Sequence, residues 1–247
     1  MGADFDKINV SGFRDKRDEG EFLLSVFPAD AVIVWARDEQ IWGPLLDNLA
    51  GICPDGRFTV EVAKQDGTYR TNFLPSVAVL PPPGREYFAG TTVGEQLAFY
   101  AAQAGRRDNT GHGEEIPFGL DFSRKLNHSV WELGEGERRC LLLASQSLAQ
   151  PLCWILYSPL ERMDGVRTRA VAEFISRQRN RGAIILAGTS SPAALLGCCN
   201  GLLALGDDEA EVAYYGKGAE AAEYLETLLN LPVGMLEASK AGRDKNE

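Results

Sequence analysis

The side chains best suited to act as nucleophiles, bases or soft metal ligands in this sequence are two histidines and five cysteines. They are His112, His128, Cys53, Cys140, Cys153, Cys198 and Cys199. A zinc site needs cysteine and histidine ligands at short regular spacings, and the sequence has no C-x-x-C pair or histidine-supported set. No Gly-x-Ser-x-Gly pattern places a nucleophile beside a base. We expect surface histidines and reduced thiols packed as small apolar side chains, with a redox role for adjacent Cys198 and Cys199 as the alternative.

Carboxylates are the other chemically capable group, because they outnumber the basic side chains. The chain has 247 residues, with 25 Lys plus Arg and 35 Asp plus Glu, so its formal net charge is −10. This sign argues against binding to duplex nucleic acid and against polybasic attachment to a membrane surface. The acidic run 207–209 is expected to form a solvated turn and not a cation site.

The elements that must position any site are short apolar strands alternating with helices. Apolar runs predict strands at 31–35, 58–62, 77–80, 152–156 and 183–186. Apolar residues at helical spacing predict helices at 45–50, 93–100, 137–148, 165–179 and around 224–229. Thr92 is expected to cap the second of these helices and Gly51 to end the first. The alternation is typical of an α/β domain with a largely parallel sheet.

The remaining segments predict a protein without its own membrane span. No apolar run approaches the roughly 20 residues that a span needs. The first residues lack the basic region and apolar stretch of a secretory signal. Residues 105–119 are expected to form an exposed linker within the domain.

The strongest motif lies at residues 133–164, LGEGERRCLLLASQSLAQPLCWILYSPLERMD. This segment resembles the stretch from the signature motif to the D-loop of ABC-type ATPases, in which an LSGGE/Q motif opens a helix. In that family the helix ends near a proline, and a buried strand then ends in DEP before the D-loop. Leu133, Pro151, Pro159 and Asp164 stand in the matching register without a gap.

The rest of the chain resembles the same family in the same order. Residues 32–51 resemble its strand, phosphate loop and helix, 77–82 its strand leading into the Q-loop, and 182–191 its strand and switch segment. The run TTVGEQLAFY at 91–100 is similar to the LTVxENLxFYA helix of subunits that serve ABC-2-type exporters. The stretch 151–156 faintly resembles the haem-exporter ATPase of cytochrome c maturation and is too short to name a cargo.

The resemblance covers about residues 8–216 and implies a fold. That fold is α/β, with a RecA-like P-loop NTPase core of the ABC ATPase type, an antiparallel β-subdomain and a helical subdomain. It implies an ABC ATPase-like domain at 1–216, with the helical subdomain at about 91–150. A C-terminal helix and frayed tail are expected at 217–247.

The phosphate loop of the family is replaced residue by residue. Such a loop turns glycine N–H groups, a Lys and a Ser/Thr toward the nucleotide. The matching positions here are Ala36, Glu39, Ile41, Trp42, Gly43 and Pro44. Trp42 stands in place of the Lys, and Asp38 and Glu39 put carboxylates where phosphates would lie, so the local field has the wrong sign. Pro44 also lacks an N–H donor.

The residues at the other motif positions of the family's nucleotide site are replaced as well. The Mg²⁺-ordering Asp becomes Tyr157, the catalytic Glu becomes Ser158, the Q-loop Gln becomes Pro82 and the switch His becomes Ser190. None of these side chains supplies a hard anionic ligand or a carboxylate base. We expect no catalytic residue, no cofactor, no metal and no ATP binding in the usual mode.

The signature motif is altered in a different way. Its positions hold Leu133, Gly134, Glu135, Gly136 and Glu137. In the family this motif faces the nucleotide of the opposite subunit, so a degenerate subunit can still complete a partner's site. Here the hydroxyl is lost at Gly134, and the Glu135 carboxylate would repel a γ-phosphate. A structural contribution is favoured, and help to a partner's ATP site stays open.

The resemblance implies a non-hydrolysing, pseudo-ATPase subunit of an ABC-2-type transporter complex. Its expected partners are an active ABC ATPase subunit and ABC-2-type transmembrane subunits, gripped through the region after Pro82, and not nucleic acid. We expect it in the cytoplasm, peripheral to the inner (plasma) membrane and held there only through partners. Two alternatives remain: a stand-alone scaffold or regulatory protein, and an ATPase-fold protein that binds another ligand in the old nucleotide cleft near Trp42 and Tyr157.

Overall fold

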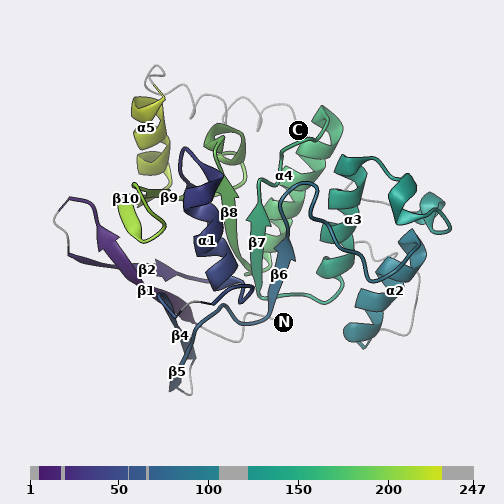
Figure 1. Ribbon diagram of the computed structural model, residues 1–247, viewed down its shortest axis with the longest axis horizontal. Coiled ribbons are helices and arrows are strands. Elements are labelled where there is room, and N and C mark those ends of the chain that lie inside the picture. The colour runs from purple at the N-terminus through teal and green to yellow at the C-terminus, as the bar shows by residue number, and fades with distance from the viewer. Residues whose placement is uncertain (1–5, 18–19, 55, 65–66, 106–121, 230–247) are drawn as a thin grey trace.

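The computed structural model describes residues 6–17, 20–54, 56–64, 67–105 and 122–229. Ten strands form one sheet in the order β5-β4-β1-β10-β9-β3-β8-β7-β6, and β2 pairs with β1 outside this path (Figure 1). The strands are β1 Lys7–Asp15, β2 Glu21–Val26, β3 Ala31–Trp35, β4 Thr59–Lys64, β5 Gly67–Thr71, β6 Val77–Leu80, β7 Cys153–Tyr157, β8 Ile184–Thr189, β9 Gly201–Leu205 and β10 Glu211–Lys217. The helices are α1 Glu39–Leu49, α2 Val93–Gln103, α3 Glu135–Ser147, α4 Gly165–Asn180 and α5 Ala219–Leu228, with 3-10 turns η1 Ser123–Lys125, η2 Val130–Glu132 and η3 Pro192–Leu195.

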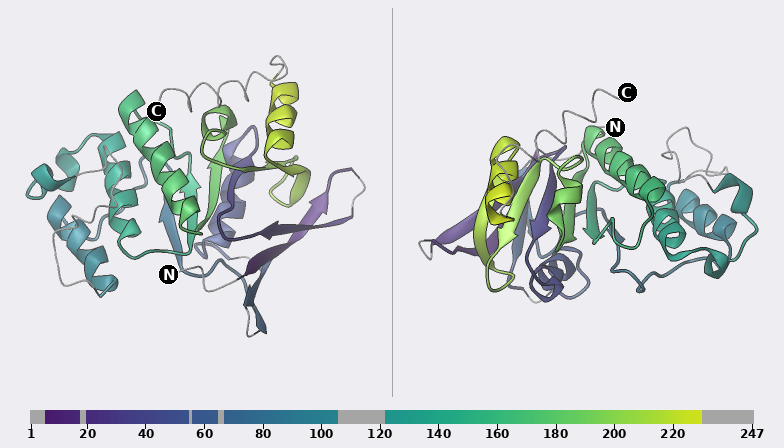
Figure 2. Two further views of the ribbon diagram at one scale, coloured as in Figure 1. Left: turned by 180° about the vertical axis from the view of Figure 1, so that it is seen from behind. Right: turned by 90° about the horizontal axis from the view of Figure 1, so that it is seen from above.

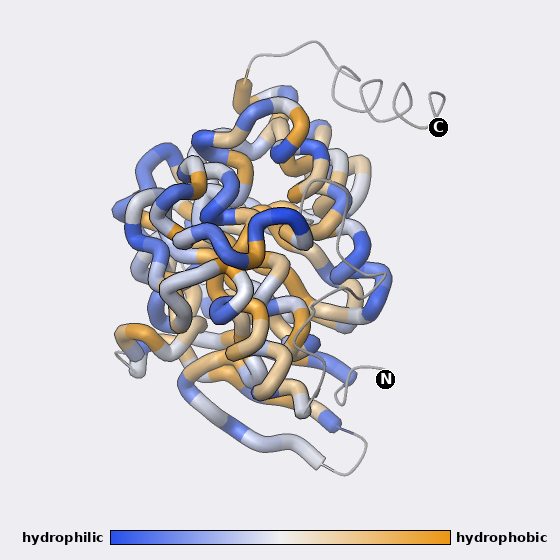
Figure 3. Tube along the Cα trace, turned by 90° about the vertical axis from the view of Figure 1, so that its right-hand side faces the viewer, coloured by the Kyte–Doolittle hydropathy of each residue, from blue (hydrophilic) through white to orange (hydrophobic). Residues whose placement is uncertain are grey.

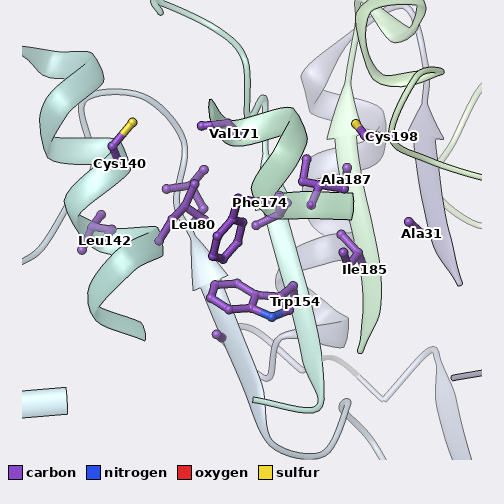
Figure 4. Close-up of a cluster of buried hydrophobic side chains, with 14 of the residues drawn as sticks. Ala31, Leu80, Cys140, Leu142, Trp154, Val171, Phe174, Ile185, Ala187 and Cys198 are labelled. Atoms are coloured by element: carbon purple, nitrogen blue, oxygen red, sulfur yellow. The ribbon is translucent and has the colours of Figure 1, made fainter. Parts of the chain in front are cut away.

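The central strands β6, β7, β8, β3 and β9 run parallel to one another. Every residue of β3, β7, β8 and β9 is buried, because helices cover both faces of this part of the sheet. Helix α1 covers one face, and α3, α4 and α5 pack on the other (Figures 1 and 2). On the face covered by α3, α4 and α5, the Trp154 indole of β7 meets the Phe174 ring of α4 edge-on, with centroids 5.0 Å apart (Figure 4).

The strands β1, β2, β4 and β5 form an antiparallel extension at one end of the sheet. A bulge in β1 between Val10 and Phe13 contains Gly12 at φ +108°. A Cβ built on Gly12 would lie 2.4 Å from the carbonyl oxygen of Arg57, so only glycine fits this close backbone approach. The β4–β5 hairpin projects away from the helices (Figure 1).

The acidic run 207–209 forms the turn between β9 and β10, as predicted. Its carboxylates are paired with basic side chains in or next to β1 and β4. Asp208 lies 2.7 Å from Arg14, Asp207 lies 3.0 Å from Lys16, and Glu209 pairs with Arg57. The turn therefore ties the β9–β10 connection to the antiparallel extension.

Local interactions stabilise the edge of the sheet at β6 and the ends of two helices. Strand β6 lies at the edge of the sheet, and the Gln146 amide of α3 satisfies both backbone groups of Val79 at 2.9 Å, as a further strand would. Thr92 and Glu95 form the capping box that starts α2, which confirms the predicted cap. Gly51 follows α1 at φ +73°, in the left-handed conformation that ends helices.

The predicted elements lie where the sequence placed them, with shifted boundaries. The predicted strand 77–80 coincides with β6, and the predicted helix 165–179 ends one residue earlier than α4. The largest difference is α1, which begins at Glu39 rather than near 45. Apolar residues concentrate inside the molecule and polar ones on the outer loops (Figure 3). The predicted linker 105–119 and the tail after 229 lie almost wholly outside the described residues.

No helix in the described ranges is both long and apolar enough to span a bilayer.

Candidate functional site

The N-terminus of α1 is capped by the side chain of Asp38. Asp38 is the N-cap, and its carboxylate accepts a hydrogen bond of 2.9 Å from the backbone N–H of Gln40. The Asp38 carbonyl accepts another, at 3.1 Å, from the N–H of Ile41. A helix N-terminus attracts anions, and here the Asp38 carboxylate occupies that position. This closure also explains why α1 extends back to Glu39 through the positions that resembled a phosphate loop.

Trp42 lies in the core between α1 and the sheet, with no exposed surface. Its ring lies against Gly188 of β8 and 5.8 Å from the Tyr157 ring. Its Nε1 lies 3.4 Å from Ser190 Oγ. The Tyr157 hydroxyl donates to the Asp47 carboxylate of α1, and burial together with this bond raises the pKa of Tyr157 far above its usual value. These aromatic rings fix α1 against the ends of β7 and β8.

A cleft of about 270 Å³ opens where β7 and β8 end. Its walls come from the start of α1, the connection after β7 and the connection after β8. The lining residues are Glu39, Ser158, Pro159, Leu160, Glu161, Thr189, Ser190, Ser191, Ala194 and Leu195. In parallel α/β sheets, ligands bind in crevices at the carboxyl ends of the strands. The cleft is therefore the candidate functional site of this chain.

Arg139 is fully buried behind this cleft and joins three segments. Its guanidinium donates to the carbonyl oxygens of Pro81 at 2.8 Å, Tyr157 at 2.7 Å and Ser158 at 3.1 Å. The nearly buried Glu86 carboxylate lies 3.9 Å from Nη1. Burial lowers the pKa of Arg139, while the charge of Glu86 opposes that shift. The side chain holds the ends of β6 and β7 against α3.

Ion pairs join the predicted signature positions to the segment around Asp164, the predicted D-loop residue. Glu135 lies 3.0 Å from Arg162, so its charge is matched within the same chain. Glu137 lies 3.0 Å from Arg167 and also pairs with Lys125. Asp164 caps α4 by accepting from the backbone N–H of Arg167 at 2.8 Å, which fixes the start of that helix.

Three of the predicted site residues line the cleft together: Glu39, Ser158 and Ser190. Trp42 and Tyr157 do not line it, although a ligand near these two residues was one expectation. Tyr157 is the last residue of β7 and points to the α1 core, whereas Ser158 follows the strand at φ +43° and reaches the cleft.

The other predicted nucleotide-site positions lie around the cleft without lining it. Ala36 is buried after β3, Ile41 is half-buried and Gly43 is buried on α1, and Pro44 is exposed on the same helix. The Pro82 carbonyl accepts from the N–H of Arg85 at 3.0 Å and starts a turn.

Sequence reasoning missed Glu161, Leu195 and the role of Arg139. Glu161 and Leu195 have no motif of their own and reach the cleft only through the fold. An arginine within the apolar face of the predicted helix 137–148 was the one available signal, because a buried arginine needs hydrogen-bond acceptors.

The cysteines and the described histidine stand apart from this site. Cys140, Cys153, Cys198 and Cys199 are buried free thiols and Cys53 is exposed. Burial raises the pKa of both Cys140 and Cys153 to about 12. His128 is exposed, 4.0 Å from Glu132, and His112 lies outside the described residues. Within the described ranges, no group of three or more His, Cys, Asp or Glu side chains could hold a metal ion.

No protein-family model matches the chain. In sequence it is similar to the cytochrome c biogenesis ATP-binding export protein CcmA of Bartonella quintana (strain Toulouse), with 30% identity over 98 residues. It is also similar to the protein of that name from Albidiferax ferrireducens (strain ATCC BAA-621 / DSM 15236 / T118), with 27% identity over 93 residues. These matches cover 40% and 38% of this chain and 46% and 44% of the relatives. The chain thus matches less than half the length of either relative.

Solved structures match over nearly the whole chain. An ATP-binding subunit of an ABC transporter superposes with a TM-score of 0.67 at 17% identity, covering 95% of this chain and 99% of that one. The ADP conformation of an ATP-binding cassette of an ABC transporter gives 0.66 at 12% identity, covering 94% and 98%. The expected fold class is therefore confirmed: the chain has the α/β fold of ABC ATP-binding domains, with the antiparallel strands and helices described above.

Proposed function

We propose that this chain, which has the fold of the ATP-binding subunits of ABC transporters, is a non-hydrolysing subunit of an ABC-2-type transporter complex. It pairs with an active ATPase subunit and docks on membrane subunits. The shared fold and the partial sequence similarity to ATP-binding export proteins support the transporter assignment. The similarity of residues 91–100 to a helix of ABC-2-type exporter subunits supports the subtype.

The main support for the proposed lack of ATP binding is the first turn of α1, whose N-terminus is already capped. The turn that would present free N–H groups to phosphates is capped by Asp38. Trp42, at the position of the phosphate-binding Lys, is directed into the core and cannot contact a ligand. Glu39 adds a second carboxylate at the same helix start. A triphosphate at this position would be repelled by the two carboxylates and would compete with Asp38 for the backbone N–H groups.

The residues at the catalytic positions support the same proposal. Tyr157 is buried and hydrogen-bonded to Asp47, so it is not available to a metal ion. Ser158 and Ser190 reach the cleft with hydroxyl groups, which do not act as carboxylate bases at neutral pH. Together these positions offer neither a Mg²⁺ ligand set nor a base for water.

The docking part of the proposal rests on exposed aromatic side chains beyond Pro82. Tyr87 is 74% exposed and Trp131 is 66% exposed. The Trp131 ring packs edge-on against Phe88, with centroids 5.7 Å apart, and Arg138 lies over its other surface at 5.9 Å. Exposed aromatic residues held in fixed positions are typical of protein interfaces. A membrane subunit bound here would hold the chain at the cytoplasmic side of the inner membrane.

Two measurements on the full chain test the proposal. Calorimetry with Mg²⁺ and ATP should show no binding by this chain, with an active ABC ATPase subunit as the positive control. Affinity purification in mild detergent should recover an ATPase subunit and membrane subunits. Binding of ATP at ordinary Mg²⁺ concentrations would reject the pseudo-ATPase assignment.

The same purification separates the proposal from the stand-alone alternative. A Tyr87→Ser, Trp131→Ser variant should lose the membrane subunits while an exposed control, Phe73→Ser, retains them. Recovery of the wild-type chain without any membrane protein would favour a scaffold or regulatory protein instead.

A further inference from the structure

The cleft at the ends of β7 and β8 has a polar floor with an unused hydroxyl group. Ser158 is 7% exposed and lines the cleft. Its backbone is anchored on both sides, because its N–H donates to the Gly188 carbonyl at 2.8 Å and its carbonyl accepts from Arg139. Its hydroxyl has no hydrogen-bond partner among the residues that the structure describes. The hydroxyl opens into the cleft without a partner from the described chain, so it is available to a ligand or to bound water.

The backbone of Ser158 holds that hydroxyl in place at some conformational cost. Its φ is +43°, in the left-handed region that non-glycine residues rarely adopt. Such residues persist where surrounding contacts fix them, and they are frequent at binding sites. Here those contacts are two hydrogen bonds to the Ser158 backbone: its N–H donates to the Gly188 carbonyl, and its carbonyl accepts from the Arg139 guanidinium.

The rim of the cleft is acidic. Glu39 comes from α1 and Glu161 from the connection after β7, and the lining contains no Lys, Arg or His. Glu39 has no ion-pair partner in the described part of the chain. The nearest cation to Glu161 is Arg162, at 3.7 Å, and its guanidinium also pairs with Glu135 at 3.0 Å. The rim therefore repels phosphate and attracts cations.

The inner wall is apolar and the space is small. Pro159, Leu160, Ala194 and Leu195 contribute to the lining. The volume of about 270 Å³ corresponds to about nine water molecules at roughly 30 Å³ each. Two rim carboxylates are too few to enclose a divalent ion, whereas hydroxyl acceptors, carboxylates and an apolar wall match an ammonium group on a short alkyl stem.

We propose that this cleft binds a small aliphatic ammonium ion. The ammonium group donates hydrogen bonds to the hydroxyl oxygens of Ser158 and Ser190 and to a rim carboxylate, and the alkyl stem lies on Pro159 and Leu195. This ligand class goes beyond the proposed function and does not depend on it. It gives a definite chemistry to the cleft that ATP would occupy in an active subunit.

Calorimetry with 1,4-diaminobutane on the full chain tests the proposal. The neutral isostere 1,4-butanediol, MgCl₂ and inorganic phosphate serve as comparison ligands. We expect saturable binding of the diamine only. Glu39→Gln and Glu161→Gln should each weaken it by about tenfold, since each removes one of the two negative charges that attract the cation to the rim, and Ser158→Ala should weaken it without any change in net charge.

Glu173→Gln on the outer side of α4 is the matched charge control and should leave binding unchanged. Equal binding of butanediol, binding of phosphate or Mg²⁺ in place of the diamine, or equal weakening by Glu173→Gln would each overturn the proposal. Circular dichroism of every variant separates loss of the site from loss of the fold. The ATP measurement is independent, so a failure there would not be confused with a failure here.

Discussion

Gly188 of β8 lies directly beneath the indole ring of Trp42. A Cβ built on Gly188 would lie 2.4 Å from Trp42 Cε3 and 2.6 Å from Cζ3, well inside contact distance. Glycine at this point of a fully buried strand is therefore required by the neighbouring side chains of α1, Trp42 and Leu46. The pair shows how closely α1 packs on β8.

Replacing Gly188 by alanine should destabilise the protein by about 1–3 kcal/mol, the usual cost of overpacking a core. The clash involves a rigid ring held by Tyr157 and cannot be relieved by a rotamer change. Urea unfolding followed by circular dichroism measures the change. Gly165→Ala is the control, because nothing lies within 4 Å of a Cβ at that helix start, and it should be neutral.

A second substitution identifies the cause of that loss. In a Trp42→Leu background, Gly188→Ala should cost less, because the two closest clashing atoms belong to the ring, while Leu46 Cδ1, 2.7 Å from the built Cβ, still opposes the alanine. An additive double-mutant cycle would show that the alanine acts through something other than Trp42.

Arg139→Met should be among the most damaging substitutions, with a loss of about 3–5 kcal/mol. It leaves the buried Glu86 carboxylate without its cation and removes the guanidinium donor from the carbonyl oxygens of Pro81, Tyr157 and Ser158. Arg177→Met, in an exposed pair with Glu173 on α4, is the control and should change stability by less than about 0.5 kcal/mol. Denaturant unfolding compares them. Similar losses in both variants would mean that the Arg139 contacts contribute no more than a surface pair.

The stability of the fold should fall in acid partly because of Glu137. Burial raises the pKa of Glu137, but the hydrogen bonds from Lys125 and Gly134 and the charges of Lys125 and Arg167 lower it by more, so the net effect is a pKa below the usual value of a glutamate. A carboxylate with a lowered folded-state pKa stabilises the fold above its unfolded-state pKa, and that stability is lost as the pH falls through the folded-state value. Unfolding midpoints between pH 7 and pH 3 should fall less steeply in Glu137→Gln and in Lys125→Met than in the wild type. Parallel curves would assign the acid sensitivity to other groups.

One of the five cysteines should react rapidly in the native protein. Cys53 is exposed, whereas Cys140, Cys153, Cys198 and Cys199 are buried. Burial raises the pKa of Cys140 and Cys153 to about 12, which leaves almost no thiolate at pH 8. Ellman's reagent at pH 8 should titrate one fast thiol per chain, five in urea, and none rapidly in native Cys53→Ser. A second fast thiol would show that a buried cysteine is transiently accessible.

The sequence alone predicted the framework of this protein because local patterns carry that information. The all-apolar runs at 31–35 and 77–80 marked strands that are β3 and β6 with no change of boundary. The register of residues 133–164 predicted the helix and strand that α3 and β7 form, and the apolar spacing of 165–179 predicted α4. Thr92 marked the start of α2, and the structure adds Glu95, which completes the capping box.

Only the tertiary structure decided what the site contains. From the sequence, Asp38 is compatible with a loop, whereas in the structure its carboxylate caps α1. Trp42 could face either a ligand or the core, and in the structure its ring lies on Gly188 in the core. The cleft brings together Glu39, Ser158 and Leu195, which are far apart in the sequence. Hydrophobic periodicity determines which elements form, whereas the packing of α1 against β7 and β8 determines which side chains meet, because contacts between distant segments leave no local pattern.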